Sequence, residues 1–177
     1  MTDTTILMIP GIGNSGPGHW QSRWQSAHPD YRRVEQRDWD HPVCADWCAA
    51  LECAVAGAGA GSILVAHSLG CLLVAHWLHA TRQRVAAALL VAVPDPAGRQ
   101  FPTEASGFAP VPRGRLPCPS ILVASRDDPY ASIEHARERA HDWGSELVDI
   151  GRAGHINAAS GLGDWPAGRE LLARLTS

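Results

Sequence analysis

The sequence contains no lysine, and all 15 of its Lys and Arg residues are therefore arginine. Three kinds of chemistry that need a lysine are thereby excluded: the P-loop phosphate cradle, Schiff-base catalysis and a Ser-Lys dyad. The net charge is -3 and the arginines are scattered, so no basic stripe indicates a nucleic-acid partner. No apolar run approaches the roughly 18 residues that a membrane-spanning helix requires. We therefore expect neither nucleic acid nor a membrane as a partner.

An export signal and a disulfide framework are also missing. Residues 1–5 contain no basic region and no long apolar segment follows them. The five cysteines are Cys44, Cys48, Cys53, Cys71 and Cys118. An odd number argues against a disulfide framework, and we expect a cytoplasmic protein. Cys44 and Cys48 could share a metal on one helix, but no neighbouring pair completes a site. Buried packing is the better interpretation, and we expect no metal and no cofactor.

Short aliphatic runs alternate with helical patterns along the 177 residues, which suits one domain over residues 1–177. The predicted strands are residues 5–9, 33–38, 62–66, 86–93, 120–124 and 146–150, and the predicted helices are 19–28, 43–56, 69–80, 131–143 and 166–175. This alternation indicates an α/β fold, with a parallel sheet of about six strands and helices on both faces. The long segment 94–119 lacks periodicity and is expected to cover a functional site.

The stretch around Ser68 has the order strand, sharp turn, helix. A run of branched aliphatic residues ends at Ala66. Apolar side chains at Leu69, Leu73 and Trp77 then follow with helical spacing. This is the context of the G-x-S-x-G nucleophile elbow, in which a sharp turn presents a serine oxygen above the sheet. Alanine replaces the first glycine, where a small side chain still fits. The competing interpretation is that Ser68 only caps a helix.

Polar side chains at the ends of the later predicted strands supply an acid and a base. Ser68 follows the third strand, Asp128 the fifth and His155 the sixth. Functional groups gather at the carboxyl ends of parallel strands, and the order Ser, Asp, His is that of an α/β-hydrolase triad. Asp128 is preferred because it directly precedes a proline. Residues 125–129 thereby resemble the hydrolase turn in which the acid stands directly before proline. Two alternatives remain: Asp127, expected to shape the turn, and Asp95, after the fourth strand.

The chemistry of acyl transfer assigns a role to each group. His155 takes the proton of Ser68 as the serine attacks, and later gives it to the leaving group. Asp128 fixes the imidazole tautomer and stabilises the imidazolium. The oxyanion needs preorganised donors, for which we expect the backbone N–H groups of Leu69 and Ile12. One such donor is worth about 10²–10³ in rate.

Several nearby side chains have more than one interpretation. His67 directly precedes the serine but is expected to point away from it, which favours a structural role. Trp20, Trp39 and Trp165 fall in predicted loops or at the ends of elements near the site. They could form an aromatic pocket, or they could pack in the core, which is the commoner environment of tryptophan.

One motif indicates a different class of protein. Residues 11–16 match G-x-G-x-x-G after the first strand, and Glu35 and Asp38 follow at a suitable distance. That dinucleotide fingerprint requires a helix that begins inside the motif. Pro17 and Gly18 instead predict a later helix start, which disfavours this hypothesis. A third hypothesis is a non-catalytic binding protein that has kept a hydrolase scaffold.

Four segments stand out: PGIGNSGPGHW at 10–20, AHSLG at 66–70, SRDDPY at 125–130 and GHINAASGLGDW at 154–165. Together they resemble the small serine hydrolases of the retinoblastoma-binding protein nine and YdeN family. The resemblance implies an α/β-hydrolase without a large cap domain that cleaves an ester or amide. It also implies that Ser68 is the nucleophile, Asp128 the acid and His155 the base.

The eukaryotic name in this family refers to binding of a pocket protein through a Leu-x-Cys-x-Glu motif. Residues 50–54 read Ala-Leu-Glu-Cys-Ala and lack that spacing. We therefore expect a small-molecule ester or amide substrate and no protein partner.

Overall fold

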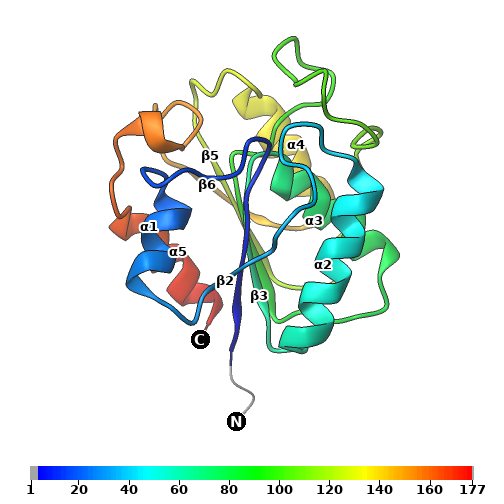
Figure 1. The fold of residues 1–177 in the computed structure, drawn as a ribbon. Coiled ribbons are helices and arrows are strands. Elements are labelled where there is room, and N and C mark those ends of the chain that lie inside the picture. Colours follow the sequence, from blue (N-terminus) through cyan, green and yellow to red (C-terminus); the bar gives the residue numbers. More distant parts are fainter. Residues whose placement is uncertain (1–3, 177) are drawn as a thin grey trace.

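A computed structural model describes residues 4–176, in which six parallel strands form one sheet (Figure 1). The strands are β1 (Ile6–Ile9), β2 (Arg32–Arg33), β3 (Ile63–His67), β4 (Ala87–Val91), β5 (Ser120–Ala124) and β6 (Glu146–Asp149). Their order across the sheet is β2-β1-β3-β4-β5-β6. The aliphatic strands β1, β3, β4 and β5 are buried along their whole length because helices cover both faces. The predicted α/β fold with a parallel sheet is confirmed.

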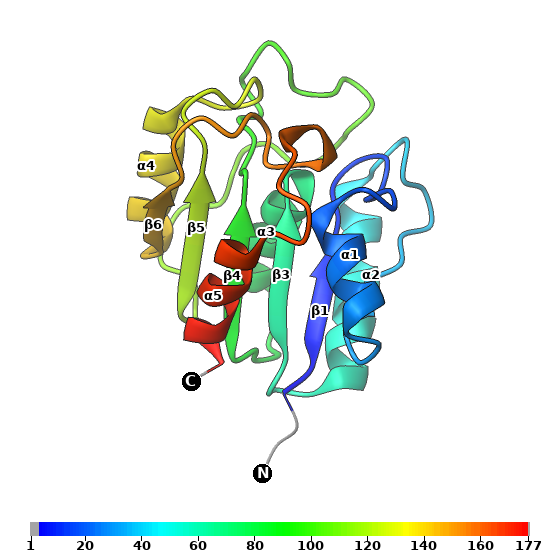
Figure 2. The same ribbon diagram turned by 90° about the vertical axis from the view of Figure 1, so that its left-hand side faces the viewer.

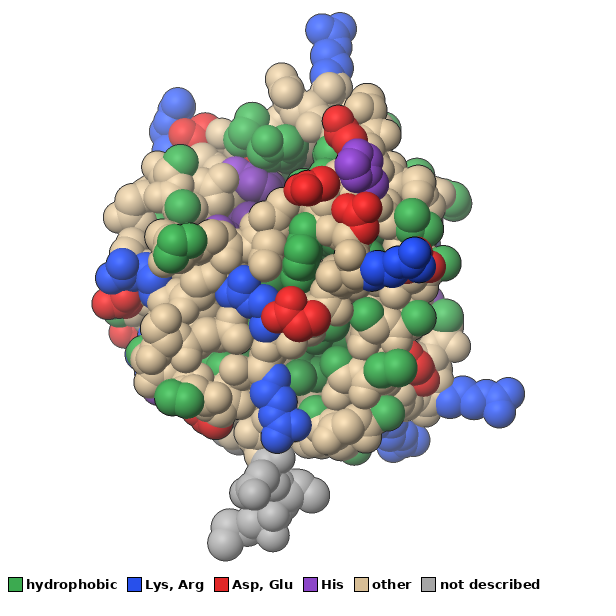
Figure 3. Space-filling model, viewed as in Figure 1, with side chains coloured by type: hydrophobic (Ala, Val, Ile, Leu, Met, Phe, Trp, Pro, Cys, Tyr) green, Lys and Arg blue, Asp and Glu red, His purple; other side chains and the backbone are tan. Residues whose placement is uncertain are grey.

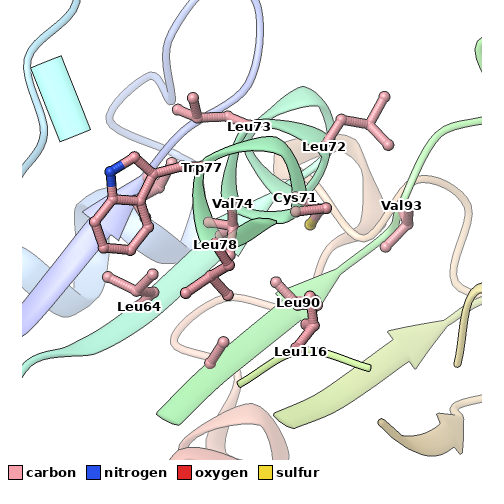
Figure 4. Packing of buried hydrophobic residues seen from close by; sticks show 14 of the residues in the cluster. Leu64, Cys71, Leu72, Leu73, Val74, Trp77, Leu78, Leu90, Val93 and Leu116 are labelled. Carbon is pink, nitrogen blue, oxygen red and sulfur yellow. The ribbon is translucent and has the colours of Figure 1, made fainter. Parts of the chain in front are cut away.

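The helices are α1 (Trp20–Ala27), α2 (Cys44–Ala58), α3 (Leu69–Ala80), α4 (Ile133–Trp143) and α5 (Pro166–Leu175), and a 3-10 turn, η1 (Ala158–Ser160), precedes α5. Figures 1 and 2 show α1 and α5 on one face of the sheet, with α2 and α3 on the other. Buried side chains of α4 join the core of α2 and α3. Figure 4 shows how Val74, Trp77 and Leu78 of α3 lie near Leu64 of β3 and Leu90 of β4 in this core. The sheet therefore separates two apolar cores.

The order of the strands reverses at β1, and this reversal opens a crevice. After β1 the chain passes through α1 to the edge strand β2, then returns through α2 to β3 on the other side of β1. Because α1 follows β1 and α3 follows β3, and these two helices cover opposite faces, the segments that leave β1 and β3 diverge at the carboxyl edge. Open α/β sheets bind ligands at such a reversal. The glycine-rich loop follows β1 and Ser68 follows β3, so both lie at this crevice.

The predicted second strand, 33–38, is wrong in its extent, because β2 contains only Arg32–Arg33. β2 is an edge strand whose single neighbour is the short strand β1. The pairing ends with a hydrogen bond of 2.9 Å from the Val34 N–H to the Met8 carbonyl. Beyond that point β1 has almost ended, so the residues after Val34 have no strand against which to continue the ladder. The other predicted elements differ from the observed ones only at their ends.

Candidate active site

Ser68 sits in a strained turn between β3 and α3. Its backbone has φ 54° and ψ -124°, and a non-glycine residue holds such a positive φ only where the surrounding structure enforces it. Ser68 occupies the N-cap position of α3, yet its side chain makes no capping hydrogen bond. Its Oγ instead lies 2.8 Å from Nε2 of His155. The geometry therefore favours a nucleophile elbow over a helix cap.

Small residues allow the elbow to lie close to the loop after β1. A Cβ atom on Gly70 would overlap a carbonyl oxygen of β1 and lie 2.8 Å from that of Pro10. A Cβ atom on Gly11 would lie only 3.0 Å from the Cβ of Ser68. Glycine at these two positions thus permits a backbone approach that a side chain would prevent. Ala66, at the first position of the elbow motif, is fully buried.

Three side chains from three strand ends form a continuous hydrogen-bonded chain. Nδ1 of His155 lies 2.9 Å from both carboxylate oxygens of Asp128, and Nε2 lies 2.8 Å from Oγ of Ser68. A carboxylate can only accept, so Nδ1 of the neutral ring carries the proton and Nε2 accepts from the serine hydroxyl. The side chains of His155 and Asp128 are only 8% and 4% exposed. Their interaction is therefore shielded from bulk water.

The two alternative acids have other partners. Asp127 accepts hydrogen bonds from the Gly154 N–H and the Ser125 hydroxyl, each at 2.9 Å. These two donors hold the pKa of the Asp127 carboxyl below its ordinary value. The hydrogen bond from Gly154 also ties the turn after β5 to the loop that carries His155, and the one from Ser125 lies within the turn, so Asp127 shapes the turn as expected. Asp95 lies 3.7 Å from a histidine of α4.

The loop that carries His155 is held by contacts from α1 and β3. Nε1 of Trp20 donates to the Ile156 carbonyl oxygen at 2.8 Å. Nε2 of His67 lies 2.9 Å from the carbonyl oxygen of His155 itself. Ile156 has a φ of 47°, which is unfavourable for a β-branched residue. These hydrogen bonds offset that strain, and they give His67 the structural role that the sequence predicts.

Two backbone N–H groups beside Ser68 are positioned as candidate oxyanion donors. Leu69 opens α3, where the first N–H groups of a helix have no intrahelical acceptor. Ile12 follows Gly11, whose added Cβ would lie 3.2 Å from the Leu69 nitrogen. Within residues 4–176, neither N–H group donates to a protein acceptor. Both residues line the cavity that contains Ser68.

Arg33, rather than a helix N-terminus, holds the glycine loop. Its guanidinium donates to Oδ1 of Asn14 at 2.6 Å and to the Ser15 carbonyl at 3.1 Å. Helix α1 begins only at Trp20, beyond the last glycine of the G-x-G-x-x-G match. A bound pyrophosphate needs that N-terminus inside the motif. The geometry therefore disfavours a dinucleotide site here.

A cavity of about 470 Å³ opens onto Ser68. Its wall is formed by the loop after β1, the elbow, the segment after β4, Tyr130 and the residues around η1. Among the described residues that line it there is no Asp, Glu or Arg. Pro94, Gln100 and Pro102 come from the long segment 94–119, whose green trace arches above the carboxyl ends of the strands in Figure 2. Figure 3, which has the same viewpoint as Figure 1, shows purple histidine side chains in a recess near the upper left of the molecule.

The three tryptophans considered for a substrate pocket pack in a core or against one. None of them is among the described residues that line the cavity. Trp20 and Trp165 contact each other under α1 and α5, with ring centroids 5.0 Å apart. Trp39 packs against Trp47 of α2, with ring centroids 5.6 Å apart. Their contribution to the site is therefore indirect, through the elements that they hold.

Two more histidines lie near His155, and burial keeps both of them neutral at pH 7. Burial lowers the pKa of His67 well below its ordinary value. Burial, aided by the Arg33 guanidinium, lowers the pKa of His19 to about 4. His19 also caps α1, because its Nδ1 accepts from the Gln21 N–H at 3.1 Å. The sequence pattern placed His19 inside the predicted helix 19–28, whereas the observed helix begins at Trp20, and no sequence signal assigned His19 to the site.

Cysteines take no part in this geometry. Cys44, Cys71 and the other three are free thiols, and burial raises the pKa of Cys71. In the described part of the chain, no three His, Cys, Asp or Glu side chains are grouped to hold a metal ion. No helix between residues 4 and 176 has both the length and the apolar character to cross a bilayer.

A parallel sheet with this strand reversal, and a strained serine directly after β3, is the architecture of the α/β-hydrolases. A family model described as Serine hydrolase matches residues 6–174. The chain therefore belongs to the serine hydrolase family. The match confirms the predicted resemblance to the small hydrolases of the retinoblastoma-binding protein nine and YdeN family.

Solved structures agree with this assignment. A protein described as a YdeN-like hydrolase from Pectobacterium atrosepticum is 32% identical, with a TM-score of 0.88 over 98% of this chain and 91% of that chain. The ydeN gene product of B. subtilis is 19% identical, with a TM-score of 0.83 over 98% of both chains. An esterase from Thermogutta terrifontis is 16% identical, with a TM-score of 0.67 over 99% of this chain and 92% of that chain. The B. subtilis and Thermogutta terrifontis structures, at 19% and 16% identity, support the fold alone. No curated protein gives a significant sequence match.

Proposed function

We propose that this protein cleaves a small ester or amide through an acyl-enzyme formed on Ser68. The observation that carries the proposal is the unbroken hydrogen-bonded chain from Ser68 through His155 to Asp128, with distances of 2.8 and 2.9 Å. Membership of the serine hydrolase family supports the same class of reaction. The strained backbone of Ser68 supports a functional role for the turn.

Acylation begins when Oγ of Ser68 bonds to the acyl carbon and its proton passes to Nε2 of His155. The bond to the leaving group then breaks, and the leaving group takes that proton from Nε2. In deacylation a water molecule gives a proton to Nε2 as its oxygen attacks the acyl carbon. Ser68 then leaves with that proton, which restores the enzyme. Asp128 stays ionised throughout and holds the Nδ1–H of His155.

The negative charge of each tetrahedral intermediate needs donors that are already in place. We assign this role to the backbone N–H groups of Ile12 and Leu69, which lie on either side of the close contact between Gly11 and Ser68. Because neither N–H group has a protein acceptor within residues 4–176, binding the oxyanion requires no hydrogen bond to be broken. Each donor is expected to contribute about 10²–10³ in rate.

The shape and charge of the cavity support a small, uncharged substrate. Its volume is about 470 Å³, and no Asp, Glu or Arg is found among its described lining residues. A charged acyl group would lose hydration there without gaining a partner. We expect short-chain 4-nitrophenyl esters to be cleaved faster than long-chain ones. Strong activity on long chains together with weak activity on short ones would contradict this substrate class.

A fluorophosphonate probe tests the nucleophile directly. We expect the wild-type protein to be labelled on Ser68, as located by mass spectrometry, and the folded Ser68→Ala variant to remain unlabelled. An assay with 4-nitrophenyl acetate should run beside it, because a closed cavity could exclude the probe. A folded protein that neither reacts with the probe nor cleaves the ester would instead be a binding protein on a hydrolase scaffold.

A further inference from the structure

The imidazole of His155 contacts two aromatic rings that the proposed reaction does not use. The ring centroid of His67 is 4.9 Å away, at an interplanar angle of 61°. The ring centroid of Tyr130 is 4.3 Å away, at an angle of 50°. His67 has an assigned task, because its Nε2 contacts the carbonyl oxygen of His155. The Tyr130 ring has none.

Tyr130 is held in place by its backbone rather than by its hydroxyl. Its N–H donates to Oδ1 of Asp128 at 2.9 Å, and its carbonyl accepts from the Asp95 N–H at 3.0 Å. Pro129 restricts the backbone immediately before it. The ring is half-buried in the cavity wall. Among the described residues, its hydroxyl has no hydrogen-bond partner, and its ring is the part of Tyr130 for which a contact with His155 is observed.

The charges around His155 define what this contact does during the reaction. Once Ser68 has given up its proton, His155 is an imidazolium. Among residues 4–176, the carboxylate that pairs with it is that of Asp128. His67 and His19 carry no opposing positive charge at pH 7, because burial lowers the pKa of both. The electron-rich face of an aromatic ring attracts a cation within about 6 Å of its centroid, and Tyr130 is inside that range.

We propose that Tyr130 is a positioning residue whose ring stabilises the imidazolium of His155 that forms as the acyl group is transferred. The contact acts on the charged form of His155 and therefore on the transition state more than on the resting enzyme. The expected effect of this contact on the reaction rate rests on the proposed function. The expected effect on the protonation of His155 does not, because the rings of Tyr130 and His155 are in contact in the free protein.

Three replacements at Tyr130 separate the ring from the hydroxyl and from simple packing. Tyr130→Phe keeps the aromatic face and should retain kcat. Tyr130→Leu keeps apolar bulk without the face, and should lower kcat by about three- to thirtyfold with little change in KM. Incorporation of pentafluorophenylalanine at position 130 keeps the ring shape but reverses its quadrupole. It should lower kcat at least as much as leucine does, without disturbing the fold.

Proton NMR titration of the His155 ring provides a readout that needs no turnover, with the resonance identified by its loss in His155→Gln. The ring should protonate about half a pH unit or more lower in Tyr130→Leu and in the pentafluorophenylalanine protein than in wild type. The acid limb of kcat/KM should move in the same direction. Equal titration midpoints in all four proteins would overturn the inference, as would a Tyr130→Phe variant as impaired as Tyr130→Leu. If no ester is cleaved, the proposed function fails, while the NMR midpoints still decide the role of Tyr130.

Discussion

At the scale of single residues, Asp127 and Asp128 show how position separates two identical side chains. Asp128 places both carboxylate oxygens 2.9 Å from Nδ1 of His155. Asp127 instead accepts from a backbone N–H and a serine hydroxyl, and its role is to fasten two loops together. The adjacent proline was the sequence signal that favoured Asp128, and the geometry supports the same choice.

Asparagine replacements at these two positions should therefore differ sharply. In Asp128→Asn the amide can no longer hold Nδ1 as a proton donor, so the wrong tautomer faces Ser68. We expect kcat on 4-nitrophenyl acetate to fall by about 10³–10⁴ while the melting temperature changes little. Asp127→Asn is the matched control, because its amide oxygen can still accept the Gly154 N–H, and its loss should be far smaller. Equal losses in the two variants would contradict the assignment of the acid.

Contacts made by other single residues could not be read from the sequence. Trp20, Trp39 and Trp165 fit a pocket or a core equally well until their neighbours are known. Trp20 and Trp165 are buried in one core, and Trp39 is half-buried against the other. Tyr130 lies two positions after the predicted site residue Asp128, yet its contact with His155 joins two different loops. Such contacts depend on how the loops cross above the sheet, which no local pattern describes.

At the scale of elements, the approach of α3 to β1 depends on the absence of one side chain. Gly70 lies in the first turn of α3, where alanine would ordinarily favour a helix. Here a Cβ atom would collide with the backbone carbonyls at the end of β1. Those carbonyl groups belong to the main chain and cannot rotate away as a side chain could. Helix α3 and strand β1 would therefore have to move apart.

We expect Gly70→Ala to lower the free energy of unfolding by about 2 kcal/mol or more, and to displace the elbow so that activity is also lost. Gly57→Ala is the matched control, because Gly57 is an exposed residue of α2 and a Cβ atom added there would meet no other atom within 4 Å. That variant should be stabilised by about 0.5 kcal/mol. Urea unfolding of both variants measures the difference, and a Gly70→Ala protein as stable as Gly57→Ala would refute the close approach.

At the scale of the whole molecule, the buried histidines make stability depend on pH. Folding lowers the pKa of His19 from 6.5 to about 4. Between these values the unfolded chain binds a proton that the folded protein does not, so stability rises with pH across this window. The stability that the neutral His19 side chain contributes to the folded protein is fully present above pH 6.5 and is lost as the pH falls toward 4. His67 acts in the same direction, because its pKa is also lowered.

His19→Asn tests this contribution, because asparagine can still cap α1 but does not titrate. Between pH 7 and pH 4 we expect the wild-type protein to lose about 3 kcal/mol more of its unfolding free energy than the variant does. Urea unfolding at several pH values measures both slopes, and His41→Asn, a change at an exposed histidine, controls for the substitution itself. If the unfolding free energies of wild type and His19→Asn changed in parallel with pH, His19 would have the same pKa in the folded and unfolded states, and the prediction would be wrong.

The sequence alone determined the class of the fold and the order of the site residues. Both are carried by local signals: continuous aliphatic strands, the turn at Ser68, and polar residues that directly follow strands. Tertiary structure decided where β2 ends, because an edge strand extends only as far as its neighbour β1. It also brought Ser68 and His155, 87 positions apart, within 2.8 Å. It surrounded His155 with Tyr130 and two neutral histidines, because packing across the sheet, and not chain neighbourhood, sets which rings meet.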